Sequence, residues 1–155
     1  MRLKGKTAIV TGASNGMGSS ESKLFASEGA NVVLADVDSE AGQQLVEEIS
    51  EGGGNAHFEI CDVSNEENWQ SMTSNVLAKY GSVDILVNNA GISSTSTSDL
   101  LSTDAWNNIM EVNSTGVFLG TKTAAEIMKS QGGGSIVNIS SIMGFVGGEY
   151  GHPAY

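Results

Sequence analysis

The chain has 155 residues, of which 39% are hydrophobic, and its 7 Lys or Arg against 18 Asp or Glu give a formal net charge of −11 at pH 7. A chain of this length supports one domain with its own core. The acidic balance, without any basic run, disfavours nucleic acids and anionic membranes as partners.

Short apolar runs rich in Val and Ile alternate along the chain with longer amphipathic segments. The runs predict strands at residues 7–11, 31–36, 56–60, 85–88 and 135–139. The segments between them predict helices at residues 17–28, 39–51, 65–80 and 104–129, the last one broken or bent near 113–116. This alternation is typical of βαβ units. The sequence therefore predicts an α/β fold: a single Rossmann-type domain over residues 1–155, with a doubly wound parallel sheet of about five strands.

Local signals at the predicted helix ends agree with these boundaries. Ser64 followed by Glu67 forms a capping-box pattern at the start of the third helix. Gly29, Gly52 and Gly81 follow the ends of the first three helices, where glycine is a common C-terminal cap.

Neither a metal site nor a membrane span is expected. The single cysteine, Cys61, excludes an internal disulfide, and His57 and His152 lie far apart without other ligands at suitable spacing. No apolar run approaches the ~20 residues that cross a bilayer. We therefore expect a cytoplasmic protein that carries no metal.

A glycine-rich loop follows the first predicted strand and opens the first helix. In this loop Gly12 permits a tight turn, Gly16 lets the backbone approach phosphate oxygens, and Gly18 lets the helix pack closely on the sheet. The N-terminus of the helix offers unpaired N–H groups and partial positive charge to a pyrophosphate. An ordinary glycine-rich turn between a strand and a helix is the alternative at this point.

The second predicted strand ends in a carboxylate. Asp36 lies where an acidic side chain accepts hydrogen bonds from the adenosine ribose hydroxyls of a dinucleotide. Asp36 and Asp38 would repel a 2′-phosphate, and neither the glycine loop nor Val37 offers a basic partner for one. These residues predict NAD as the cofactor in preference to NADP.

Together these motifs resemble the classical short-chain dehydrogenase/reductase family over the whole chain. The matches are Thr11, Gly12, Gly16 and Gly18 in the first loop, then Asp62-Val63, Asn88-Asn89-Ala90-Gly91, Asn113, Ser141 and Tyr155. The resemblance implies an oxidoreductase that transfers a hydride between a nicotinamide and a secondary alcohol or ketone. Met143, Phe145 and Val146 suggest that this substrate is apolar or cyclic.

The resemblance also implies the roles of individual residues. Tyr155 would be the acid/base, Ser141 would hydrogen-bond the reacting oxygen, and Asn113 would hold a helix bend and a proton-relay water. The cofactor-binding residues would be Gly12, Ser14, Asn15, Gly16, Met17, Gly18, Asp36, Val37, Asp62, Val63, Asn89, Ala90 and Gly91.

In this family a lysine follows the tyrosine by four positions, whereas the sequence ends at Tyr155. We therefore expect an incomplete member whose 155 residues alone give negligible turnover. Full-length members commonly form homotetramers, an assembly not expected of this chain alone. One alternative is a non-catalytic NAD-binding module. Another is an epimerase or dehydratase of the extended branch, whose glycines are usually spaced Gly-x-x-Gly-x-x-Gly.

Overall fold

The computed structural model describes residues 1–93, 102–146 and 154. Its centre is a parallel sheet of five strands in the order β3-β2-β1-β4-β5. The strands are β1 (Thr7–Thr11), β2 (Asn31–Asp36), β3 (Asn55–Ile60), β4 (Ile85–Asn88) and β5 (Ser135–Asn138). The strand order reverses between β1 and β4, which divides the sheet into two halves.

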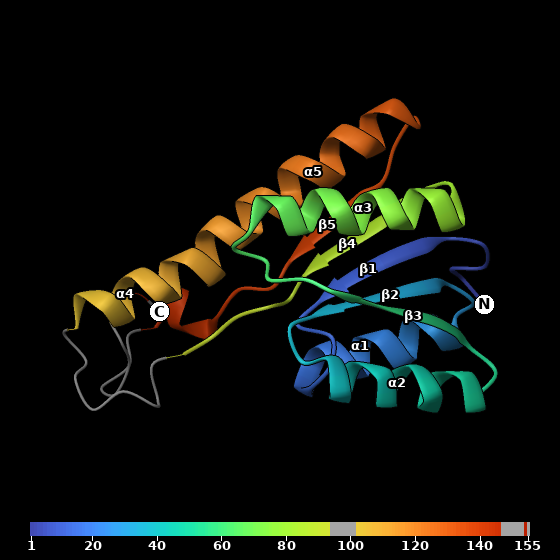
Figure 1. Cartoon of the computed structure of the whole chain (residues 1–155), viewed down its shortest axis with the longest axis horizontal. Helices are drawn as coiled ribbons and strands as arrows, with labels where there is room; N and C mark the ends of the chain where they lie inside the picture. Colours follow the sequence, from blue (N-terminus) through green and yellow to red (C-terminus); the bar gives the residue numbers. More distant parts are fainter. Residues whose placement is uncertain (94–101, 147–153, 155) are drawn as a thin grey trace.

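Helices cover both faces of the sheet (Figure 1). They are α1 (Gly16–Ser27), α2 (Ser39–Glu51), α3 (Glu66–Tyr80), α4 (Thr103–Met110) and α5 (Gly116–Ser130). Helices α1 and α2 lie on one face, α3 and α5 lie on the other, and α4 extends beyond the body of the domain. A short 3₁₀ helix, η3 (Ile142–Gly144), follows β5. The doubly wound α/β fold predicted from the sequence is confirmed.

The central strands are buried on both faces, which explains why they are continuous apolar runs instead of alternating ones. On the face covered by α3 and α5, Ile9 and Val33 pack with Trp69. On the opposite face, Val10 and Leu34 pack with residues of α1 and α2. Each side chain named here is fully or almost fully buried.

The structure corrects one predicted helix start, that of α3, and refines one predicted helix end, that of α2. Helix α3 begins after Asn65, whose Oδ1 accepts from Glu67 N at 2.9 Å and Asn68 N at 3.2 Å, so Asn65 is the N-cap and the expected Ser64 capping box is wrong. Ser64 instead donates its hydroxyl to Asp62 Oδ1 at 2.7 Å. At the C-terminal ends, Gly81 has the left-handed conformation expected of a cap (φ 80°). After α2 that conformation belongs to Gly53 (φ 78°) and not to Gly52.

The break expected in the long fourth helix is present as a change of helix type. Residues Glu111–Thr115 form a π-helical segment, η2, between α4 and α5. Segments of this kind are uncommon and are frequent at functional sites. The π-helical segment is therefore a candidate part of a functional site.

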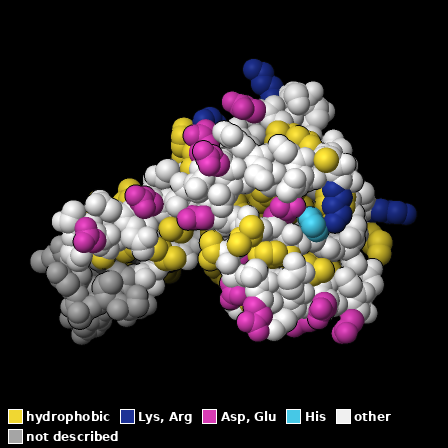
Figure 2. All heavy atoms as spheres, viewed as in Figure 1, with side chains coloured by type: hydrophobic (Ala, Val, Ile, Leu, Met, Phe, Trp, Pro, Cys, Tyr) yellow, Lys and Arg dark blue, Asp and Glu magenta, His cyan; other side chains and the backbone are white. Residues whose placement is uncertain are grey.

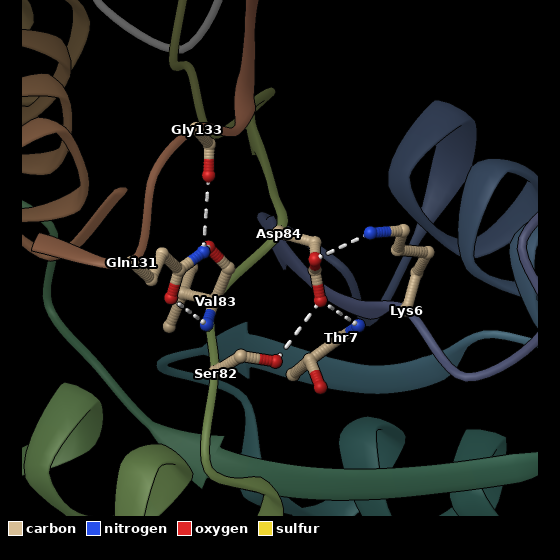
Figure 3. Close-up of polar contacts among 7 residues, drawn as sticks. All are labelled: Lys6, Thr7, Ser82, Val83, Asp84, Gln131 and Gly133. Atoms are coloured by element: carbon tan, nitrogen blue, oxygen red, sulfur yellow. Dashed lines mark hydrogen bonds and ion pairs between the residues drawn. The ribbon is translucent and has the colours of Figure 1, made fainter. Parts of the chain in front are cut away.

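A polar cluster fixes the amino-terminal edge of the sheet (Figure 3). Asp84, just before β4, accepts from Lys6 Nζ at 2.8 Å and from the backbone N–H of Thr7 at 2.9 Å. The Ser82 hydroxyl also donates to Asp84, at 3.0 Å. Nearby, Gln131 donates to Val83 O at 2.6 Å, joining the end of α5 to the same segment. The starts of β1 and β4 are thus joined by side chains as well as by the ladder.

Acidic side chains gather over α2 on the face shown in Figure 2. This helix exposes Glu40, Glu47, Glu48 and Glu51. Within the described residues, no helix combines the length and apolar character needed to cross a membrane. That part of the chain also holds no group of three or more His, Cys, Asp or Glu that could bind a metal ion. The cytoplasmic location stays a prediction.

Candidate cofactor and active site

The loops at the carboxyl ends of β1, β2, β3 and β4 enclose a cavity of about 440 Å³ beside the reversal in strand order. Open α/β sheets bind their ligands at this place, because the loops on either side of the reversal diverge and leave a crevice. The cavity is lined by Gly12, Asn15, Gly16, Met17, Asp36, Val37, Cys61, Asp62, Val63, Asn89, Ala90, Gly91, Ile92 and Val112.

The glycine loop has the conformation that its glycines were expected to provide. Gly12 and Gly16 adopt positive φ angles of 62° and 57°. A Cβ on Gly12 would lie 2.8 Å from Ala90 Cα, whereas one on Gly16 would meet nothing within 4 Å, so Gly16 borders open space. Asn15, the N-cap of α1, makes no side-chain cap hydrogen bond, and the first turn of the helix carries no acidic residue. This end of α1 can therefore receive an anion.

Hydrogen bonds from the turn after β4 hold the glycine loop in place. The Asn89 side chain donates from Nδ2 to Thr11 O at 2.9 Å and to Gly12 O at 3.2 Å. In return, Thr11 Oγ1 accepts from Asn89 N and Ala90 N, both at 3.0 Å. Asn89 Oδ1 is buried and has no hydrogen-bond partner among the described residues. It is an acceptor whose hydrogen-bonding capacity is unused among the described residues.

Asp36 stands at the end of β2, and each of its carboxylate oxygens accepts a backbone hydrogen bond. Oδ2 accepts from Ser14 N at 2.9 Å, and Oδ1 accepts from Asp38 N at 3.0 Å. A carboxylate has about four acceptor positions, so Asp36 keeps capacity for ligand hydroxyls. Asp38 instead caps α2 through Ala41 N at 3.1 Å.

The loop after β3 forms a further wall of the cavity. Val63 is fixed there because Trp69 Nε1 donates to Val63 O at 2.8 Å. Cys61 is 1% exposed, and burial, with Asp62 and Glu59 nearby, raises the pKa of its thiol to about 12. Cys61 is thus an uncharged packing residue at physiological pH.

A second cavity of about 400 Å³ adjoins the first. The two share Met17, Asn89, Ala90, Gly91 and Ile92. One face of the helix that runs from α4 into α5 also lines the second cavity, with Met110, Asn113, Ser114 and Val117 at helical spacing. The lining also includes Ile139, Ser140, Ser141 and Gly144, from the end of β5 onward.

Asn113 and Ser141 both line this second cavity. Asn113 Oδ1 accepts from Ile92 N, and its Nδ2 donates to Ile92 O, both at 2.9 Å, so the π-helical segment is tied to the loop after β4. Ser141 Oγ accepts from Met143 N at 3.1 Å. This bond uses an oxygen lone pair and leaves the hydroxyl hydrogen available to donate. The expected acid/base, Tyr155, lies outside the described residues.

Most of the residues expected to bind the cofactor line the first cavity, and Ser14 and Gly18 are the exceptions. Ser14 is 7% exposed and donates its hydroxyl to Asp38 O at 3.1 Å, so its polar groups hold the loop. A Cβ on Gly18 would lie 2.2 Å from Gly12 O, which shows that Gly18 allows close packing. Three lining residues were not predicted from the sequence, because no motif signals them: Cys61, Ile92 and Val112.

Comparisons with known proteins agree with this geometry. The family model for short chain dehydrogenases matches residues 6–155. A crystal structure of a short-chain type dehydrogenase/reductase from Mycobacterium marinum superimposes with a TM-score of 0.91 at 35% sequence identity. That superposition covers 97% of this chain and 61% of the other.

Two curated relatives are named as dehydrogenases of cyclic alcohols. A cyclopentanol dehydrogenase of Comamonas sp. (strain NCIMB 9872) is 44% identical over 146 residues, covering 94% of this chain and 58% of the relative. A trans-4-hydroxycyclohexanecarboxylate dehydrogenase of Sinomonas cyclohexanicum is 40% identical over 152 residues, with the same shares covered, 94% and 58%. The chain thus spans a little over half the length of these relatives.

Proposed function

Because this chain belongs to the short-chain dehydrogenase family, we propose that the protein is an NAD-dependent oxidoreductase acting on a secondary alcohol or ketone. The observation that carries the proposal is the pair of adjoining cavities, which share Met17 and the turn Asn89–Gly91. The first has the glycine loop and the acidic residue that suit a dinucleotide, and the second holds Asn113 and Ser141.

Three observations on the residues of the first cavity support a dinucleotide as its ligand. Gly16 leaves open space beside the N-terminus of α1 for a pyrophosphate. Asp36 retains acceptor positions for ribose hydroxyls, and Asn89 Oδ1 is an unpartnered buried acceptor. Asp36 also favours NAD over NADP, because its carboxylate would repel a 2′-phosphate and no Lys, Arg or His lines the described part of this cavity.

The second cavity favours a neutral, largely apolar substrate. Its described lining contains no Asp, Glu, Lys, Arg or His, while Ile92, Met110, Val117 and Ile139 supply apolar surface. A charged substrate would lose its hydration there without gaining a partner. The name of the cyclopentanol dehydrogenase agrees with a neutral cyclic alcohol as substrate, whereas the second relative is named for a cyclic alcohol that also carries a carboxylate.

When bound, the nicotinamide would supply the hydride donor or acceptor, and the remaining chemistry is the work of side chains. The Ser141 hydroxyl would donate to the alcohol or carbonyl oxygen, since its bond from Met143 N uses a lone pair and leaves the hydrogen available. Asn113 would hold the π-helical segment to the loop after β4 through its two bonds to Ile92. Tyr155 is proposed as the acid/base on the family resemblance. The negligible turnover expected of these 155 residues alone stays a prediction, as does the tetramer of the full-length protein.

The test is a binding and activity comparison on the full-length protein. Calorimetric titration with NAD and NADP should show clear preference for NAD, and absorbance at 340 nm should show reduction of NAD with cyclopentanol or cyclohexanol. An Asp36→Ala variant should lose the preference between the two dinucleotides, whereas Glu40→Ala on the exposed surface of α2 should keep it. Tight NAD binding without oxidation of any secondary alcohol would favour a non-catalytic NAD-binding module instead.

A further inference from the structure

Two asparagines at the carboxyl ends of β4 and β5 are joined by their side chains. Asn88 and Asn138 are Cα partners in the parallel ladder, and Asn88 Nδ2 donates to Asn138 Oδ1 at 2.8 Å. The backbone ladder continues one residue further, because Ile139 N donates to Asn88 O at 2.9 Å. The side-chain bond therefore stands where both strands pass into loops.

Asn88 is itself fixed by α5. Its Nδ2 also donates to Thr121 Oγ1 at 3.2 Å, so both of its amide hydrogens are engaged. Gly120 brings the helix so close that a Cβ there would lie 2.5 Å from Asn88 Oδ1. Asn88 is 3% exposed, which leaves it little room to move. Asn138 thus bonds to a group whose position is set by the interior of the domain.

The segments that follow the two asparagines both line the second cavity. Asn88 leads into the turn Asn89–Gly91, and Asn138 leads into Ser140 and Ser141. Strand β5 has only 4 residues, and among the described strands its sole partner is β4. The course of the chain toward Ser141 therefore depends on how the end of β5 is held against the end of β4.

We propose that Asn138 is a positioning residue for Ser141: its bond to Asn88 fixes the separation between the Ser141 hydroxyl and the wall formed by Asn89–Gly91. The inference rests on the proposed function, since the donor role of Ser141 belongs to it. Catalysis is sensitive to such a separation, because a misplacement of about 1 Å can cost about 100-fold in rate.

A matched pair of substitutions separates positioning from packing. Asn138→Asp keeps an acceptor oxygen at the same place, whereas Asn138→Leu has a similar volume and no acceptor. In the full-length protein oxidising cyclopentanol with NAD, kcat should fall ~10- to 100-fold in Asn138→Leu and stay near wild type in Asn138→Asp. The Kd for NAD should be unchanged in both, because the glycine loop is untouched. Ser135→Ala, at the other end of β5, is the control.

Amide hydrogen exchange supplies a readout that does not depend on turnover. The Met143 amide, which donates to Ser141 Oγ, should exchange faster in Asn138→Leu and at the wild-type rate in Asn138→Asp, while amides of β1 keep their protection. Equal loss of kcat in both variants would overturn the proposal. Wild-type kcat or unchanged Met143 exchange in Asn138→Leu would do so as well. If the wild-type protein oxidises no alcohol, the proposed function fails, and the exchange of Met143 still decides whether Asn138 positions Ser141.

Discussion

Replacing Asp84 with Asn tests how firmly the amino-terminal edge of the sheet is held. One carboxylate oxygen accepts from Lys6 Nζ, and the other accepts from Thr7 N and the Ser82 hydroxyl (Figure 3). An amide has a single acceptor oxygen, so Asn can serve only one of these two sides and turns an N–H donor toward the other. At least one hydrogen bond to a charged acceptor is therefore lost.

The Thr7 bond dominates the effect, because it is either lost or, where the amide oxygen stays on its side, reduced to a bond with an uncharged acceptor. Thr7 is 1% exposed, and a hydrogen bond to a charged group contributes about 1.5–3 kcal/mol. The ion pair with Lys6, whose side chain is 55% exposed, contributes less than about 1 kcal/mol. We expect Asp84→Asn to lower the free energy of unfolding by about 2 kcal/mol. The Tm should fall by about 4–8 °C.

Urea unfolding followed by circular dichroism would measure this change, with Lys6→Met and Ser82→Ala as controls that each remove one contributor. We expect the free energy of unfolding to fall much more in Asp84→Asn than in either control. A loss of less than about 0.5 kcal/mol in Asp84→Asn, within the range of ordinary surface substitutions, would refute the reasoning. A loss in Lys6→Met as large as that in Asp84→Asn would show that the ion pair, and not the buried backbone bond, dominates.

The same cluster predicts a dependence on pH. Burial by itself raises the pKa of Asp84, but the hydrogen bonds from Lys6, Thr7 and Ser82 outweigh it, and the pKa is lowered in the folded protein. Folding therefore favours the ionised form. Its contribution is fully present above the unfolded pKa of about 3.9 and is lost as the pH falls through the folded value. The stability difference between wild type and Asp84→Asn should shrink below about pH 4, and a difference that grows there would contradict this account.

Three further predictions concern the core and the cofactor cavity. Gly120→Ala should destabilise the fold by about 1–3 kcal/mol in urea unfolding, because its Cβ would lie 2.5 Å from Asn88 Oδ1; Gly52→Ala, at a negative φ of −74°, should change stability far less. Asp36→Asn should weaken NAD binding by about 10-fold, the equivalent of one charged hydrogen bond, as read by calorimetry. Cys61, with its pKa raised to about 12, should resist iodoacetamide at pH 8 in the native protein and react once urea unfolds it; rapid native labelling in a mass spectrum would show the thiol to be accessible.

The strands and the glycine loop could be predicted because the sequence signals for both are local. Val and Ile runs identify buried parallel strands, and the predicted strand at residues 31–36 coincides with β2. The positive φ angles at Gly12 and Gly16 are likewise a requirement that only glycine meets readily.

The finer details of the site depend on tertiary contacts that no short pattern records. Ser14 stays a predicted cofactor contact, and its N–H and hydroxyl donate to Asp36 and Asp38, which are distant in sequence. The bond between Asn88 and Asn138 joins residues 50 positions apart. The helix N-cap at Asn65 was missed because the neighbouring Ser64 is drawn to Asp62.

The bonds between Asn89 and the glycine loop bear on the thermodynamics of ligand binding. With Thr11 O and Gly12 O held by the Asn89 amide, the backbone that we propose to bind phosphate is held in one shape by the rest of the domain. Ordering a flexible loop costs about 1–2 kcal/mol of conformational entropy for each residue fixed, and a preformed loop avoids that cost. We therefore expect the loop to act as a rigid template, whose affinity for the proposed dinucleotide is set by complementarity and is not lowered by ordering of the loop on binding.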